Sequence, residues 1–150
     1  MANYARIAVA RSSSGFTVSS NSATLTSIAA FAAMSGGAGG TVTHFGIGTA
    51  SSGTGHLLFF GTVTPNLVVA AGTTPKLDTG TTITQAASDG MTTAAANDFL
   101  NLLLNNTNWA NVGDATGLVA SSTAGSLYLS LHTSSPGEGG NQTTNEISYT

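Results

Sequence analysis

The chain has 150 residues, of which three are basic and six acidic, so only 6% of its residues are charged and its formal net charge is −3. Three basic side chains cannot neutralise a run of phosphates, and no apolar stretch reaches the length of about 18 residues that a membrane helix needs, so we exclude nucleic-acid binding and a membrane span. Because the chain has no cysteine, disulfides, thiolate metal sites and a cysteine nucleophile are excluded as well.

The first half of the sequence shows the alternation of apolar and polar residues that is typical of strands. We expect strands over residues 3–11, around 16–18, and over 23–34, 41–49, 56–63, 67–69, 76–78 and 81–84. The segment 23–34 also fits a helical period through Leu25 and Ile28, but its threonine content favours extended structure. Gly46 and Gly48 share one face of the 41–49 strand, which indicates that a backbone or a large side chain packs closely there.

The second half contains the single predicted helix, over residues 91–106. Phe99, Leu102 and Leu103 fall on one face at helical spacing, together with two alanines. Thr93 is the predicted N-cap, and Asp98 in an early turn suits the helix dipole.

A loop over residues 109–126 follows the helix, with Trp109 as its only large side chain. We then expect a strand over 127–132, a loop over 134–144 and a last strand over 146–149. Taken together, these elements predict a single domain over residues 1–150. It is mainly β, an antiparallel β-sandwich with one packed α-helix.

Candidate chemistry is sparse in this sequence. We find no catalytic motif, no phosphate-binding glycine loop and no cofactor signature. None of His44, His56 and His132 has a second histidine or a carboxylate two to four residues further on, so we predict no metal site. His44 and His132 are predicted on the outward faces of apolar strands, where they could meet in space or across a symmetry axis.

The apolar stripe on the predicted helix is broad enough to be buried on more than one surface, which favours contact between copies of the chain. We therefore expect a homo-oligomer, a trimer or larger. The candidate interface residues are Phe99, Leu100, Leu103 and Leu104 of the helix, with His44, Tyr128 and His132 of the strands.

Several short motifs point to one family. They are Leu-Tyr-Leu-Ser-Leu-His-Thr at 127–133, Pro-Gly-Glu at 136–138, Glu-Ile-Ser-Tyr at 146–149, Tyr-Ala-Arg at 4–6, Val-Thr-His-Phe-Gly-Ile at 42–47 and Gly-Thr-Thr-Pro at 72–75, followed by Ile83. With these motifs the chain resembles small phage virion proteins commonly labelled tail-fibre proteins.

The order of the motifs departs from the family, in which the helix comes first and the Tyr-Ala-Arg strand follows the Ser-Tyr strand directly. The resemblance therefore implies a circular permutant, with residues 1–89 as the family's C-terminal part, 91–150 as its N-terminal part and Gly90 as the joint. The natural start would be Met91. It also places Arg6 beside Glu146 on adjacent strands, which predicts a structural ion pair.

The resemblance implies a non-enzymatic structural protein of the virion, of tail-fibre type or a capsid decoration. It would bind its own copies and other virion components, with no cofactor. Two other interpretations stay open. One is an engineered, permuted scaffold for display or self-assembly. The other is a protein that binds glycans or ice through threonine-rich strands at 41–43 and 81–84, although a regular Thr-x-Thr repeat is missing.

Overall fold

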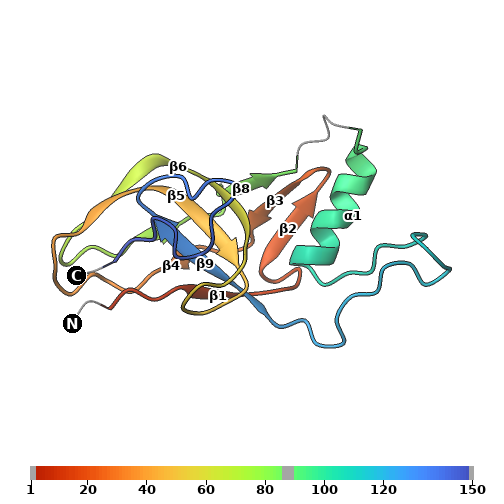
Figure 1. The fold of residues 1–150 in the computed structure, drawn as a ribbon, viewed down its shortest axis with the longest axis horizontal. Coiled ribbons are helices and arrows are strands. Elements are labelled where there is room, and N and C mark those ends of the chain that lie inside the picture. Colours follow the sequence, from red (N-terminus) through yellow and green to blue (C-terminus); the bar gives the residue numbers. More distant parts are fainter. Residues whose placement is uncertain (1–2, 86–89, 149–150) are drawn as a thin grey trace. The chain divides into compact units, whose positions relative to one another are not determined.

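The computed structural model describes residues 3–85 and 90–148 of the chain (Figure 1). The chain forms two compact units, and each unit combines segments that are far apart in the sequence. Unit 1 comprises Met1–Val9, Ile28–Asp78 and Leu127–Thr150, and unit 2 comprises Ala10–Ser27 and Thr79–Ser126.

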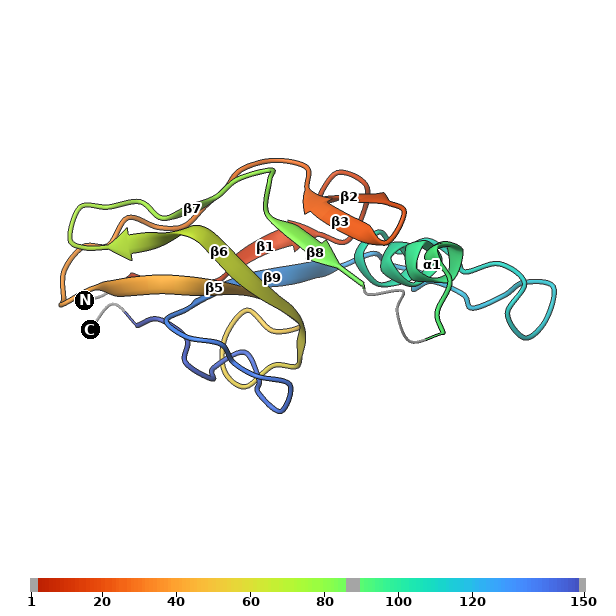
Figure 2. The ribbon, with the colours of Figure 1, turned by 90° about the horizontal axis from the view of Figure 1, so that it is seen from above.

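Unit 1 is built around a four-stranded sheet with the strand order β1-β9-β5-β6. The bounds are Ile7–Ala10 for β1, Ser126–His132 for β9, Gly40–Gly48 for β5 and Leu57–Val69 for β6. Strand β5 pairs antiparallel with both β9 and β6. A two-stranded antiparallel sheet joins β4 (Ala29–Ala30) to β7 (Lys76–Leu77). Figure 2 shows β7 lying over one face of the larger sheet.

The central strands of unit 1 are buried on both faces. On one face Phe45 pairs with Leu131 and Ile47 with Leu129, and all four side chains are buried. On the other face Gly46 lies against the side chains of Ser130 and His132, which a Cβ at that position would contact at 2.7 Å. The prediction that large groups pack closely against the glycine face of this strand is confirmed.

Unit 2 packs one helix on a three-stranded antiparallel sheet. The sheet has the order β2-β3-β8, with β2 at Phe16–Ser19, β3 at Ser22–Leu25 and β8 at Thr82–Thr84. The helix α1 spans Thr93–Leu104 and contacts β2 and β3. Its small core consists of Phe16, Ala23, Leu25, Ile83, Ala96, Leu100 and Leu104. The molecule is thus mainly β with antiparallel sheets and one helix, as the sequence predicts.

The details of the helix differ from the prediction. Its N-cap is Thr92, whose hydroxyl accepts a hydrogen bond from the Ala95 amide, and not Thr93. No acidic residue lies in the first turn, so Asp98 does not serve the dipole there. The buried positions follow an i, i+4, i+8 line through Ala96, Leu100 and Leu104, because the sheet contacts the helix one residue further along than the period around Leu102 and Leu103 suggested.

The strand bounds also differ in places. The segments 56–63 and 67–69 form one long strand, β6, because both pair with β5. The expected strand at 146–149 is reduced, within residues 146–148, to an isolated bridge between Glu146 and His132. Tyr149 of that strand lies outside the described residues, as do residues 88–89 next to the expected joint at Gly90.

Candidate functional site

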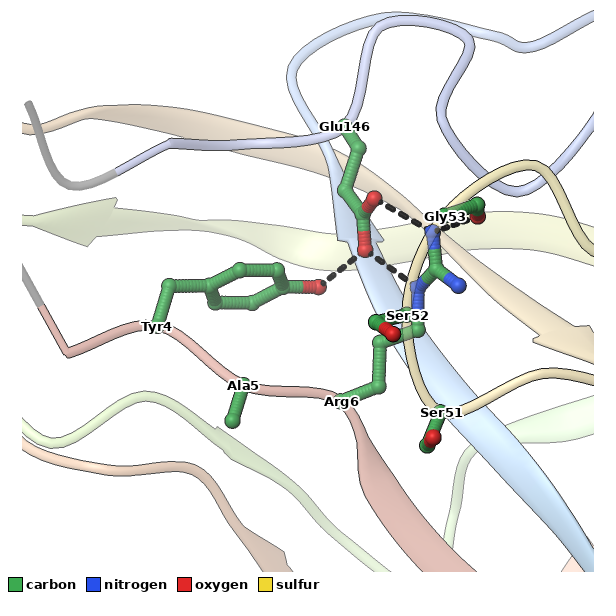
Figure 3. A pocket seen from close by; sticks show the side chains of 7 residues that line it. All are labelled: Tyr4, Ala5, Arg6, Ser51, Ser52, Gly53 and Glu146. Carbon is green, nitrogen blue, oxygen red and sulfur yellow. Dashed lines mark hydrogen bonds and ion pairs between the residues drawn. The ribbon is translucent and has the colours of Figure 1, made fainter.

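The most polar interior cluster of unit 1 joins Tyr4, Arg6 and Glu146 (Figure 3). The Nε and Nη2 atoms of Arg6 donate to the two carboxylate oxygens of Glu146, each at 2.7 Å. The Arg6 side chain is only 3% exposed and that of Glu146 14%. Two parallel hydrogen bonds at this distance are the strongest form of an ion pair between these residue types. The ion pair lies where the sequence and the resemblance predict it.

Arg6 also holds the loop that connects β5 to β6. Its Nη1 atom donates to the carbonyl of Ala50 at 3.0 Å, and Nη2 donates to the carbonyl of Gly53 at 2.9 Å. The guanidinium therefore ties together three segments that are distant in the sequence: the residues before β1, the loop at 50–53, and the segment around Glu146. Its fixed fork geometry makes this possible, because each donor points in a different direction.

Tyr4 completes the cluster. Its hydroxyl donates to Oε1 of Glu146 at 3.0 Å and accepts a hydrogen bond from the Leu131 amide at 2.9 Å, while its ring stacks on Phe31 at 6.2 Å. Burial, followed by the charge of Glu146, raises the pKa of the Tyr4 hydroxyl far above its ordinary value. The hydroxyl is therefore protonated at neutral pH and acts as a donor. The hydrogen bond to Glu146 likewise raises the pKa of Arg6.

A cavity of about 150 Å³ adjoins the cluster and is lined by Tyr4, Ala5, Arg6, Ser51, Ser52, Gly53 and Glu146. Both carboxylate oxygens of Glu146 and the nitrogens of Arg6 already have partners in the chain. A general base needs a carboxylate within reach of a substrate proton, and a nucleophile needs such a base beside it. The cluster is thus equipped to fix the loop rather than to react.

His44 of β5 and His132 of β9, which the sequence analysis allowed to meet, are paired directly in the register of the two strands. The Nδ1 atom of His132 lies 2.8 Å from the carbonyl of Thr144, so Nδ1 carries the proton, and Nε2 accepts a hydrogen bond from Ser130 at 2.9 Å. His132 is fully buried, so its predicted outward position is wrong. The loop around Thr144 covers that face of the sheet.

Ser130 and His132 have the connectivity of a serine activated by a histidine, but both side chains have zero exposure. A substrate could not reach this hydroxyl. Burial lowers the pKa of His132 below its ordinary value, which keeps the ring neutral. Within residues 3–85 and 90–148, no group of three or more His, Asp or Glu side chains is arranged to hold a metal ion.

The other candidate interface residues occupy different depths. Leu100 and Leu104 are fully buried inside unit 2, where the helix contacts β2 and β3, so they are not available to a partner. Phe99 and Leu103 of the helix are half-buried, as are His44 and Tyr128 of unit 1.

Sequence reasoning missed Gln142, a fully buried side chain that, like Arg6, forms hydrogen bonds with the β5–β6 loop. Its Oε1 accepts from the Ala50 amide at 2.8 Å and its Nε2 donates to the Ala50 carbonyl at 3.2 Å. Gly48 and Gly55 leave the room for it, since a Cβ on either would lie about 2 Å from Gln142 atoms. In the sequence, these two glycines were the feature that could have indicated a side chain packed between them.

A second missed feature is exposed apolar surface on β6. Leu58 is 36% exposed, Phe60 37% and Val68 72%, in a strand whose sequence is strongly apolar. Three further exposed apolar side chains, Val112, Leu118 and Val119, lie in unit 2 on the segment after the helix.

Residues 1–85 of the 150 match the family described as Podophage GP4 fiber I protein gp80. The chain belongs to this family. The gp80 family is one of phage fibre structural proteins, which agrees with the resemblance seen in the sequence. No curated protein and no solved structure matches the chain.

The gp80 match covers β1 to β8, whereas β9 lies outside it. In the sheet of unit 1, β9 stands between β1 and β5, so the matched strands complete their sheet only with a segment from beyond the match. None of the helices within the described residues has the length and apolar character to cross a membrane.

Proposed function

We propose that this chain is a non-enzymatic structural protein of a phage virion, which binds copies of itself and other virion components as part of a fibre or as a capsid decoration. The observation that carries the proposal is the family match over more than half of the chain. The same match implies that the protein resides in the virion.

The construction of unit 1 supports a structural role. Its buried polar groups, Arg6, Ser130, His132 and Gln142, all have hydrogen-bond partners within the chain. Arg6, His132 and Gln142 bond to loop segments, and Ser130 bonds to His132 on the same strand. Such fully satisfied networks make a domain rigid. A surface with few charges also has little to desolvate when two proteins come together.

The mass of the protein in solution tests the self-association. We would measure it by light scattering behind a sizing column over a hundredfold range of concentration. A mass that is a multiple of 14.8 kDa supports the proposal. A mass of 14.8 kDa throughout contradicts self-association of the isolated chain, and binding to purified fibre or capsid components would then test the remainder.

We also propose that the chain is a circular permutant of the family order, with the joint at Gly90. The hydrogen bond between Tyr4 and Glu146 supports this, because it brings the segment before β1 beside the segment that precedes it in the family order. Permutation is tolerated where the joined ends lie close together. A chain that starts at Met91 and runs through Thr150 into Asn3 should unfold at the same denaturant concentration. A chain in that order that does not fold would contradict the proposal.

A further inference from the structure

The outer edge of β6 is one of the two edges of the four-stranded sheet in unit 1. In the part of the chain that the structure describes, β6 is the last strand of the four-stranded sheet and pairs only with β5 (Figure 1). It spans 13 residues, more than twice the average strand of about five to six residues. Such an edge presents a row of backbone donors and acceptors to whatever strand can align with it.

The β6 edge lacks the charges that usually defend edge strands against pairing. No residue between Arg11 and Lys76 is charged, so neither β6 nor β5 beside it carries a charge. Proline is the other common defence, and Pro65 interrupts the edge once. This leaves residues 57–64, with the exposed side chains of Leu58 and Phe60, as the longest uninterrupted stretch.

The opposite edge of the same sheet differs in both respects. Strand β1 has only four residues and is bounded by Arg6 and Arg11, two of the three basic residues of the chain. A short edge next to charged side chains is a poor template for pairing. Of the two ends of this sheet, only β6 is therefore suited to receive a further strand.

We propose that residues 60–64 of β6 pair antiparallel with the same residues of a second copy of this chain, across a two-fold axis perpendicular to the sheet at Thr62, so that Thr62 faces its own copy. Two four-stranded sheets would then form one continuous sheet of eight strands. The inference rests on the self-association proposed above and names the surface that performs it.

The absence of charge is what selects a second copy as the occupant. In a two-fold antiparallel pair, residues next to the axis face their own copies, so any charged residue there would face an identical charge at a cost in free energy. This segment has none. The perpendicular axis also keeps each sheet face on its own side, so the exposed residues Phe60, Thr62 and Thr64 would face one another.

Thr62→Lys tests the pairing, because Thr62 is exposed and central in the segment. Placing two like charges opposite each other should raise the dissociation constant of the dimer at least tenfold, measured by light scattering over a concentration series. The matched control is Thr82→Lys, which places the same change on β8, the end strand of the sheet in unit 2. The control should leave the dissociation constant unchanged.

Cysteine crosslinking gives an independent measurement, since the chain has no cysteine of its own. Single cysteines at 58, 60, 62 and 64 should include one that forms a disulfide dimer on mild oxidation, whereas Thr82→Cys should not. If the protein is oligomeric but Thr62→Lys keeps its mass and no β6 cysteine crosslinks, the β6 pairing is overturned and self-association stands. If the unmodified chain stays at 14.8 kDa, both are overturned.

Discussion

Removing the carboxylate of Glu146 should strongly destabilise unit 1. In Glu146→Ala the guanidinium of Arg6 loses both 2.7 Å hydrogen bonds, and it stays buried, with its side chain only 3% exposed. Breaking a buried ion pair from one side costs about 3–5 kcal/mol, because the remaining charge is left without compensation. At about 2–4 °C per kcal/mol for a chain of this size, the melting temperature should fall by roughly 10 °C.

The aromatic residues allow the two units to be followed separately. Tyr4 and Tyr128, the described tyrosines, belong to unit 1, and the single tryptophan, Trp109, belongs to unit 2. Urea unfolding should therefore be followed by tyrosine near-UV circular dichroism and by tryptophan fluorescence in the same samples. In Glu146→Ala the tyrosine transition should move to lower urea. The tryptophan transition moves with it only if the units unfold together.

The control is Glu138→Ala, which removes the other glutamate of the chain. Because Glu138 is exposed, this change should alter the free energy of unfolding by less than about 0.5 kcal/mol. The double variant Arg6→Met with Glu146→Leu removes both charges and should recover part of the loss. The reasoning is refuted if Glu146→Ala lowers the stability of unit 1 by no more than the Glu138 control, since the pair would then be worth no more than a surface ion pair.

Three further changes have predictable results. Gly48→Ala places a Cβ 2.0 Å from the buried glutamine beside it and should cost about 1–3 kcal/mol in urea unfolding, whereas Gly139→Ala, with open space around it, should be neutral. Because burial holds the pKa of His132 below 6.5, the unfolded chain takes up the proton first as the pH falls. The stability contributed by neutral His132 should therefore be fully present above about pH 6.5 and be lost below it. His132→Gln should reduce the decrease in the free energy of unfolding between about pH 7 and 5, and His56→Gln should not. Arg11→Ala removes two 2.6 Å hydrogen bonds to the last helical carbonyls and should cost about 1–3 kcal/mol, seen by tryptophan fluorescence.

The local elements could be predicted from the sequence because they depend on period and spacing. The alternation in 41–49 and 127–132 identified both central strands, and the apolar spacing around Phe99 identified the helix. The glycines of β5 correctly predicted that other side chains pack closely against that face of the strand. Each of these features depends on residues that are close together in the sequence, so predicting it requires no knowledge of the tertiary structure.

The depth of burial could not be predicted in the same way. A single strand shows which residues share a face, but not whether a loop later covers that face. His132 was expected to point outward and is buried because the segment around Thr144 lies over it. Likewise, β6 has an apolar sequence that does not show its place in the sheet. It became a half-exposed edge because the strand order ends there, and strand order is a property of the whole chain.

Three of the nine charged side chains, Arg6, Arg11 and Glu146, hold the fold together, and this bears on what the surface can do. Of the three basic residues, Arg6 fixes a loop and the Glu146 segment, and Arg11 holds the end of the helix. Only Lys76 stays fully on the surface. Charges that hold the fold together cannot also keep copies of the chain apart, so the long stretch from residue 12 to 75 has hydroxyl groups and backbone as its polar surface. A protein that had to remain solitary in a crowded cell would be poorly served by this distribution. The same distribution of charges suits a protein that packs against its own copies. The β6 edge is the uncharged strand edge at which such pairing would meet no charge repulsion.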